Sequence, residues 1–428
     1  MEVNGMLVNQ NRIQNRLEQL AVIGKIGETG VCRLAHSKED REAVDLFRTW
    51  MDEAGFETEI DCFGNLVGKL QGTDPSAPLL VIGSHLDSQP YGGRFDGAAG
   101  CVAALEVAQT LKENDQRLVH GFHLICFSDE EGSRFAKGLF GSKGLLGMLK
   151  KDDLERQDKN GMTRREALQE FGVNPLDISY EGVYKAQDLL AFLELHIEQG
   201  PILDKSNEPI GIVTGISGPL WLTVTLEGKA GHTGSVPMSL RQDALVGAAE
   251  IVGAIRETVT RDPEAKTIGS VGSLRVFPDS RNIIPEKVTF TVDLRDIDLE
   301  RRNECEEIIM AKIKDVCQKH HLTYDVSEDT RSDPKYCADW IKDAMREEAK
   351  KMNVTAPEIM SGPFHDAITF SEVCDYGMIF IRCKDGISHH PDEFSTYADI
   401  ALGTELLYHT ALKIGSGAYK KAAETTIK

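Results

Sequence analysis

Histidine and acidic residues stand in small groups after apolar runs at four points of this sequence. The groups are His85 with Asp87, Glu130 with Glu131, His196, and His389 with His390. Imidazole nitrogens and carboxylate oxygens are ligands that borderline divalent metals such as zinc accept. A carboxylate held off the metal can act as the general base for an attacking water. The pattern therefore predicts metal-assisted hydrolysis.

Three imidazoles and two carboxylates suit two metal ions that share one bridging carboxylate. The predicted metal ligands are His85, Asp96, Glu131, His196 and His389. Asp96 is the predicted bridge, because the small residues after it allow close approach to metals that lie about 3.5–4 Å apart. Glu130 is the predicted base, and Asp87 is predicted to fix the ring tautomer of His85.

Each of these residues also has a purely structural interpretation. His85 and Asp87 could simply close a strand, and Glu130 and Glu131 could lie in a solvated turn. Asp96 could be the N-cap of the helical run from 101 to 111. Three adjacent acids, 129 to 131, would repel one another unless cations were present, and this favours the metal interpretation.

Four continuous apolar runs predict strands that are covered on both faces, as in an α/β fold with a mostly parallel sheet flanked by helices. They span 78–83, 122–127, 189–195 and 378–383. Sites in open α/β sheets lie beyond the carboxyl ends of the strands, so we expect the polar groups there to converge. Helical spacing predicts early helices at 11–26 and 37–54, with Ser37 as a cap.

The stretch from 215 to 333 has a different pattern. Alternating residues at 222–227 and 288–294 predict strands, and 243–259 and 299–320 predict helices. This order is typical of an α+β, ferredoxin-like unit. We predict a catalytic domain formed by 1–214 and 334–428, with 215–333 inserted as a lid.

Composition excludes several other classes. The chain has 428 residues with 48 basic and 68 acidic ones, a formal charge of -20 that disfavours nucleic acid as a partner. The nine cysteines form no C-x-x-C pair, and the sequence contains no export signal and no apolar run of about 18 residues. We therefore expect a cytoplasmic protein that does not bind membranes. The lysine-containing tail after Gly415 is interpreted as a helix end.

Six segments in this order resemble the M20-type metallohydrolases, in the branch of N-carbamoyl-L-amino-acid hydrolases, allantoate amidohydrolases and β-ureidopropionases. The resemblance covers nearly the whole chain, and HIEQGP in particular is similar to this branch rather than to the M20 peptidases. The segments are GSHLDSQPYGGRFDGAAG (83–100), FSDEEGSRF (127–135), ELHIEQGP (194–201), GKAGHTGSVPM (228–238), RNIIPEKVTFTVDLRD (281–296) and GISHHPDE (386–393).

The resemblance implies the same five ligands, the same bridge and the same base. It also implies a homodimer formed through the lid, in which His232 reaches the neighbouring subunit's site and polarises the scissile carbonyl. The residues that it places around the substrate are Gln199, His232, Asn282, Arg295 and Gly362. Arg295 suits a carboxylate, although pairing with Asp293 or Asp296 on a surface strand is the alternative.

The sequence departs from the family pattern at Pro363-Phe364, where a small Ala-Gly pair is usual, and this could reshape the pocket. The family's His-x-Pro-x-Glu spacing selects His389 as the ligand, so His390 is expected to face away. The predicted reaction converts an N-carbamoyl-L-amino acid to the amino acid, ammonia and carbon dioxide, with two divalent metals per subunit. Zinc is expected, with manganese, cobalt or nickel as alternatives.

Three other functions stay open at this point. Allantoate amidohydrolases share every motif above. A dipeptidase or aminoacylase of the wider superfamily is disfavoured by HIEQGP. A non-catalytic binding protein is disfavoured because the base and the whole ligand set are present.

Overall fold

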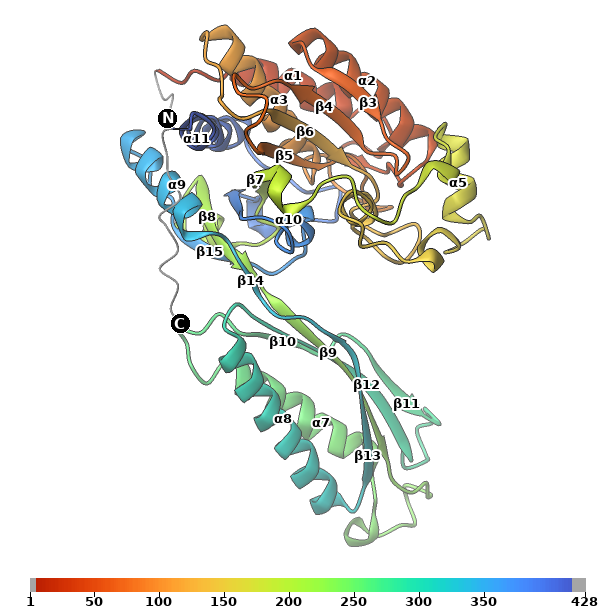
Figure 1. Cartoon of the computed structure of the whole chain (residues 1–428). Coiled ribbons are helices and arrows are strands. Elements are labelled where there is room, and N and C mark those ends of the chain that lie inside the picture. The colour runs from red at the N-terminus through yellow and green to blue at the C-terminus, as the bar shows by residue number, and fades with distance from the viewer. Residues whose placement is uncertain (1–4, 418–428) are drawn as a thin grey trace. The chain divides into compact units, whose positions relative to one another are not determined.

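The computed structural model describes residues 5–417, which form two compact units (Figure 1). Unit 1 contains the described residues up to Thr214 and those from Cys337 onward, and unit 2 runs from Gly215 to Tyr336. Each unit has its own apolar core.

One mixed sheet forms the centre of unit 1. Its central strands, in spatial order, are β16 (Tyr376–Ile381), β7 (Leu189–Ile197), β5 (Leu79–His85) and β6 (Phe122–Phe127). Neighbours among these four are parallel. They correspond to the four apolar runs, so the predicted parallel sheet is confirmed.

Shorter strands extend this sheet on both sides. Beyond β6 lie β4 (Leu66–Leu70) and β3 (Glu57–Ile60), and beyond β16 lie β8 (Ile210–Ile216), β15 (Glu358–Ser361) and β14 (Lys335–Tyr336). β4 runs antiparallel to β6, and β8 runs antiparallel to β16. A separate hairpin pairs β1 (Lys25–Ile26) with β2 (Gly30–Val31).

Helices cover both faces of the central strands (Figure 1). One face packs in a single apolar cluster with α1 (Gln10–Leu20), α2 (Lys38–Ala54), α3 (Ala98–Glu113), α9 (Asp339–Lys351) and α11 (Tyr397–Gly415). Side chains alternate along a strand, so the residues between those of the cluster face the other side. There Phe370 stacks on Phe192 at 4.3 Å between ring centroids. His196, four residues after Phe192, lies on this same face of β7.

The remaining helical elements of unit 1 are short. They are α4 (Phe140–Leu145), α5 (Arg164–Phe171), α6 (Ile202–Ser206), α10 (Asp366–Phe370), and the 3-10 turns Lys151–Leu154, Pro175–Asp177, Ala186–Asp188 and Lys384–Gly386. Phe370 belongs to α10, so this helix covers the site-bearing face of the sheet.

Both early helices are present, but only one of them has the bounds that the sequence predicted. Ser37 caps α2 as predicted, because its hydroxyl accepts a hydrogen bond from Asp40 N at 3.2 Å. The first helix ends at Leu20, so the prediction that it continues to residue 26 was wrong. The buried Arg33 guanidinium donates to the carbonyl oxygens of Leu20 (3.0 Å) and Ile23 (3.3 Å), and this tertiary contact satisfies the end of the helix.

Unit 2 is an antiparallel sheet covered on one face by two helices. Its elements are β9 (Gly218–Glu227), the 3-10 turn Met238–Leu240, α7 (Ala244–Val259), β10 (Ile268–Ser270), β11 (Leu274–Phe277), β12 (Lys287–Asp296), α8 (Leu299–His320) and β13 (Thr323–Arg331). The spatial order is β10-β12-β9-β13, with β11 also on β12. Alternate residues of β9 and β12 are buried against α7 and α8.

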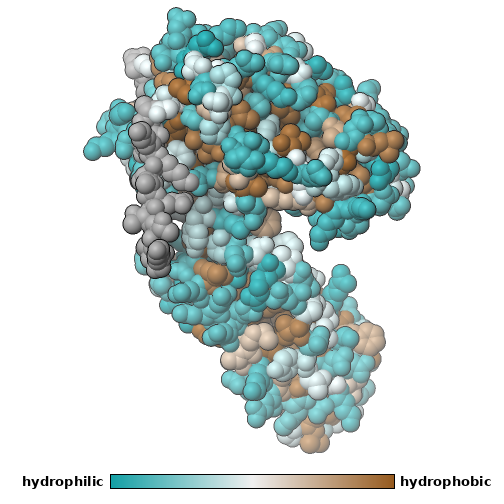
Figure 2. Space-filling view, in the orientation of Figure 1, coloured by the Kyte–Doolittle hydropathy of each residue, from teal (hydrophilic) through white to brown (hydrophobic). Residues whose placement is uncertain are grey.

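Among residues 5–417, no helix combines the length and apolar character needed to cross a membrane. Hydrophilic residues make up most of the face that Figure 2 shows, with apolar ones scattered among them. Helix α11 ends at Gly415, and the tail after Gly417 lies outside the described residues.

Candidate metal centre

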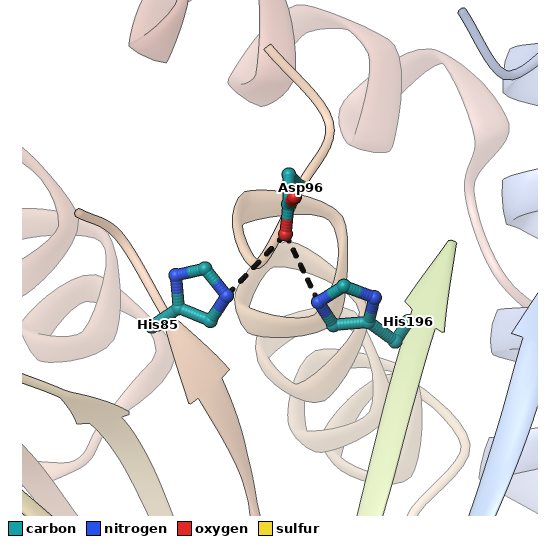
Figure 3. Close-up of side chains that lie close together, drawn as sticks. All are labelled: His85, Asp96 and His196. Carbon is teal, nitrogen blue, oxygen red and sulfur yellow. Dashed lines mark ion pairs between the residues drawn. The ribbon is translucent and has the colours of Figure 1, made fainter. Parts of the chain in front are cut away.

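His85, Asp96 and His196 meet at the carboxyl ends of the central strands (Figure 3). His85 is the last residue of β5, His196 is the next-to-last residue of β7, and Asp96 precedes α3. One carboxylate oxygen, Asp96 Oδ1, lies 3.4 Å from His85 Nε2 and 3.1 Å from His196 Nε2. All three side chains are buried. The structure thus brings together three of the five predicted ligands.

The other oxygen of Asp96 belongs to a second group with Glu131 and His389. Asp96 Oδ2 lies 3.3 Å from His389 Nε2, and Glu131 Oε2 lies 3.6 Å from the same nitrogen. The two groups therefore share only Asp96, one on each carboxylate oxygen. This is the arrangement that a bridging carboxylate between two cations requires.

The tautomers of two imidazoles leave lone pairs facing a carboxylate, and a cation between them would bind both. His85 Nδ1 lies 3.0 Å from the carbonyl oxygen of Asp87, and His196 Nδ1 lies 2.9 Å from that of Ile197. A carbonyl oxygen only accepts, so each Nδ1 carries the proton and each neutral Nε2 presents a lone pair. Those lone pairs face a carboxylate, which also only accepts. The buried Nε2 of His196 accordingly has no hydrogen-bond partner, although Asp96 is close. A cation between these atoms fits the donor set.

The electrostatics of the cluster agree with this interpretation. Burial opposes protonation, but the Glu130 and Asp96 carboxylates raise the pKa of His85 well above its usual value. The hydrogen bond to Asp96 raises the pKa of His389 to about 9. Burial, and next the charge of Asp96, raises the pKa of Glu131 to about 8. The cluster attracts positive charge, and a divalent ion would supply it without protons.

Glu130 and Glu131 take different places, as the ligand and base assignments require. Glu131 belongs to the group with His389, whereas Glu130 Oε2 lies 3.7 Å from His85 Nε2 and is outside both groups. Burial raises the pKa of Glu130 well above its usual value. Asp129, just before this pair, is buried and bonded to Arg164 at 2.7 Å, so the solvated-turn interpretation does not describe this segment.

Asp87 makes contacts other than those expected of its carboxylate. The carboxylate lies 3.7 Å from His85 Nδ1, and the carbonyl oxygen of Asp87 makes the closer contact with that ring. The carboxylate instead accepts hydrogen bonds from Glu130 N (3.2 Å) and Glu131 N (3.3 Å). Asp87 therefore fixes the backbone of the Glu130 segment.

Asp96 is not the N-cap of the following helix. Helix α3 begins at Ala98, its N-cap is Gly97, and no side chain caps it. Gly97 has φ +61°, and a Cβ atom there would lie 2.5 Å from the His85 ring. A side chain at 97 would collide with this imidazole, so glycine is needed for the close approach of the two segments.

Of the predicted substrate residues in unit 1, Gln199 contacts the cluster. The Gln199 amide donates to Asp96 Oδ2 at 2.9 Å and lies 3.1 Å from His389 Nε2. Its side-chain oxygen is buried without a partner. Gly362 directly follows β15. His390 packs edge-on against Tyr91 at 5.4 Å and takes part in neither ligand group.

His232, Asn282 and Arg295 all belong to unit 2. His232 is exposed and forms an isolated bridge to Ile283, next to Asn282. Gly234 N donates to His232 Nδ1 at 3.1 Å, so the neutral ring carries its proton on Nε2. Arg295 pairs with both carboxylate oxygens of Asp293 at 2.9 Å and lies over the Trp221 ring. The surface-strand pairing of Arg295 is thus present in the structure.

Four neighbours of the cluster were not singled out from the sequence. Gln89 donates to Glu131 Oε2 at 2.6 Å, and Glu393 accepts from the backbone of Asp96 at 3.0 Å. Glu194 and His365 form a further buried group with His196. Glu393, Glu194 and His365 stand in segments that already carry chemistry-bearing residues, and that is the signal for them. Gln89 likewise lies between Asp87 and Asp96 in the segment 83–100.

Comparisons with known proteins agree on the family. The family model described as "Peptidase family M20/M25/M40" matches residues 81–413. The chain is 45% identical to an N-carbamoyl-L-amino-acid amidohydrolase of Pseudomonas sp. (strain NS671), covering 95% of this chain and 98% of that one. It is 34% identical to an allantoate deiminase of Arabidopsis thaliana, covering 92% and 80%.

A solved structure from Burkholderia multivorans, an amidase of the hydantoinase/carbamoylase family, is also similar. It has a TM-score of 0.89 and 34% sequence identity, and the match covers 96% of this chain and 98% of that one. The chain belongs to peptidase family M20/M25/M40, and its cluster of histidine and acidic side chains has the donor set of a divalent-metal site.

Proposed function

We propose that this protein is a metal-dependent amidohydrolase that converts an N-carbamoyl-L-amino acid and water to the amino acid, ammonia and carbon dioxide. The observation that carries the proposal is the pair of ligand groups that share Asp96, with the Glu130 carboxylate beside them. The substrate class is supported by the 45% identical relative, which is an N-carbamoyl-L-amino-acid amidohydrolase. The allantoate deiminase relative is more distant, at 34% identity.

His85 and His196 would hold one divalent ion with Asp96, and Glu131 and His389 would hold a second with it. When bound, such ions polarise the ureido carbonyl and make water a better nucleophile near neutral pH. We assign zinc first, with manganese, cobalt and nickel as alternatives, because all four accept nitrogen and oxygen ligands.

Glu130 would accept a proton from the attacking water and deliver it to the leaving nitrogen. One C–N bond of the ureido group breaks, and the departing nitrogen takes the electron pair and this proton. The carbamate that remains then loses carbon dioxide and releases the second nitrogen, which completes the amino acid and ammonia products. Asp87 supports the step by holding the backbone of Glu130 and by orienting the His85 ring through its carbonyl oxygen. Both contacts limit the movement of the groups that must stay aligned.

His232 is the proposed donor to the developing oxyanion, because its Nε2 carries the proton in the neutral ring. We propose that it serves the site of the partner subunit in a homodimer, with unit 2 as the lid and dimerisation domain. Asn282, Gln199 and Gly362 are assigned to the substrate. Arg295 is assigned to the carboxylate of the substrate. For that role it must release Asp293 and bind the substrate carboxylate instead.

The nine cysteines are all unpaired, which fits the reducing cytoplasm that we propose as its location. The test of function is ammonia release by metal-reconstituted protein offered N-carbamoyl-L-amino acids, 3-ureidopropionate, allantoate and a dipeptide side by side. We expect release from N-carbamoyl-L-amino acids first. Preference for allantoate would move the assignment to an allantoate amidohydrolase, and cleavage of the dipeptide would favour a peptidase.

A further inference from the structure

The carboxylate of Glu393 joins two chain segments that both carry metal-ligand candidates. Its Oε1 accepts hydrogen bonds from Phe95 N at 2.9 Å and Asp96 N at 3.0 Å, residues that lie 298 and 297 positions away in sequence. Its Oε2 accepts from the Ser388 hydroxyl at 2.8 Å. Glu393 is 2% exposed. Both oxygens are therefore used in holding neighbouring protein groups.

The chain makes room for this carboxylate at Gly93. A Cβ atom at position 93 would lie 2.2 Å from Glu393 Oε1, far inside van der Waals contact. The segment that leads to Asp96 thus passes directly against the Glu393 side chain. Any methyl group at 93 would displace the carboxylate from the two backbone amides that it accepts.

The contacts of Glu393 bear on one ligand group more than on the other. Ser388 adjoins His389, and its hydroxyl also lies 3.3 Å from Asp96 Oδ2, the oxygen that faces His389. His85 and His196 are held separately, through the carbonyl oxygens of Asp87 and Ile197. Glu393 thus connects the backbone of Asp96 to the segment that carries His389, and the Gln199 amide adds a second contact between the Asp96 and His389 side chains.

We propose that Glu393 is a positioning residue that fixes Asp96 against the His389 segment and so sets the affinity for the ion held by Asp96, Glu131 and His389. The inference deepens the proposed function and rests on its metal centre. Removal of groups that orient metal ligands commonly weakens binding about 10- to 100-fold, without loss of any ligand atom.

Titration calorimetry of metal-free full-length protein with Mn²⁺ alone tests the proposal, because it measures both dissociation constants without reference to activity. We expect Glu393→Ala to weaken the binding of one of the two ions at least about tenfold, and the binding of the other by less than about threefold. Glu393→Gln should stay near wild type, since its side-chain oxygen still accepts both amides and its NH₂ group can donate to Ser388.

Two further variants separate positioning from general loss of stability. Gly93→Ala keeps the Glu393 carboxylate but displaces it, so it should weaken binding of the same ion. It takes the place of Glu393→Ala in the test if that variant does not fold. Glu405→Ala is the matched control, because Glu405 is also buried and accepts Val8 N at 2.9 Å and Leu7 N at 3.0 Å. It should lower the melting temperature and leave both metal constants unchanged.

Wild-type affinity for both ions in Glu393→Ala, or an equal loss in Glu405→Ala, would overturn the positioning role. Failure of wild-type protein to bind any ion would overturn both this inference and the proposed metal centre. Two ions bound without hydrolysis of any ureido compound would refute the proposed substrate alone and leave the assignment of Glu393 standing.

Discussion

Asp87 holds the backbone of Glu130, because its carboxylate accepts the Glu130 N–H at 3.2 Å and that of the next residue at 3.3 Å. The carbonyl oxygen of the same aspartate lies 3.0 Å from Nδ1 of His85. One residue thus orients a metal-ligand candidate and the proposed base together. The distance between a metal ion and the base depends on this connection, which lies at the point where β5 ends.

The first prediction concerns Asp87→Asn. An asparagine oxygen can accept one of the two amides, but its NH₂ group would then face the other N–H, donor against donor. We expect kcat to fall about 10- to 100-fold. Steady-state kinetics with metal content measured on the same samples checks this. Asp243→Asn, which alters a carboxylate that accepts two backbone amides in unit 2, should keep wild-type kcat. Unchanged kcat in Asp87→Asn would contradict the positioning of Glu130.

The second prediction tests whether His232 acts on the partner subunit. His232→Ala and Glu130→Gln should each be nearly inactive alone. Mixed dimers would contain one site with both an intact base and an intact histidine, so subunit exchange at equal amounts should restore up to about a quarter of wild-type activity. Ammonia release before and after exchange measures this. If His232 acted within its own subunit, no mixed dimer would contain an intact site and activity would not return.

The third prediction concerns metal removal. Lone pairs and carboxylates that face one another around Asp96 repel in the absence of a cation, so bound metal should stabilise the fold. Each ion present at about 100 times its dissociation constant adds about 2.7 kcal/mol to the free energy of unfolding. We expect a chelator to lower the melting temperature and excess metal to restore it. His85→Ala should respond much less, and an equal response in that variant would place the stabilising ion elsewhere.

The fourth prediction concerns acid stability and the buried His36. Burial, with Arg164 and Arg134 adding to it, lowers the pKa of His36 from 6.5 to about 3. The folded pKa lies below the unfolded one, so the stability linked to the neutral ring is complete above pH 6.5 and is lost as pH falls toward 3. At pH 4.5 the loss should reach about 3 kcal/mol.

Urea unfolding at pH 7 and pH 4.5 measures this loss of unfolding free energy. His36→Asn should lose less stability between the two pH values than wild type does, whatever its stability at pH 7. His321→Asn is the matched control, because His321 has a similar positive φ but is exposed. It should keep the wild-type pH dependence. Equal pH dependence in all three proteins would contradict the buried neutral histidine.

The sequence was sufficient to predict the parts of the fold that follow from local pattern. Four apolar runs predicted the parallel strands, and the polar residues after them predicted which side chains would meet, as His85 and His196 do at Asp96. Both predictions rest on a general rule, that side chains at the carboxyl ends of parallel strands share one edge of the sheet.

Contacts made through the backbone could not be predicted in this way. The end of the first helix depends on Arg33, thirteen residues beyond Leu20 in sequence, and the position of Asp96 depends on Glu393. In both cases a charged side chain binds main-chain atoms, which carry no signal of residue type. The same reason explains why the Asp87 carboxylate was assigned to the His85 ring rather than to the backbone of Glu130.

The most direct test of the proposed function is kcat/KM of metal-reconstituted protein for an N-carbamoyl-L-amino acid, its D-enantiomer and allantoate, with Glu130→Gln as the control. Wild type should prefer the L-compound over both others, and Glu130→Gln should lose about 10²- to 10⁴-fold while both metals stay bound. Preference for allantoate, or full turnover by Glu130→Gln with metal bound, would contradict the proposed reaction or its mechanism.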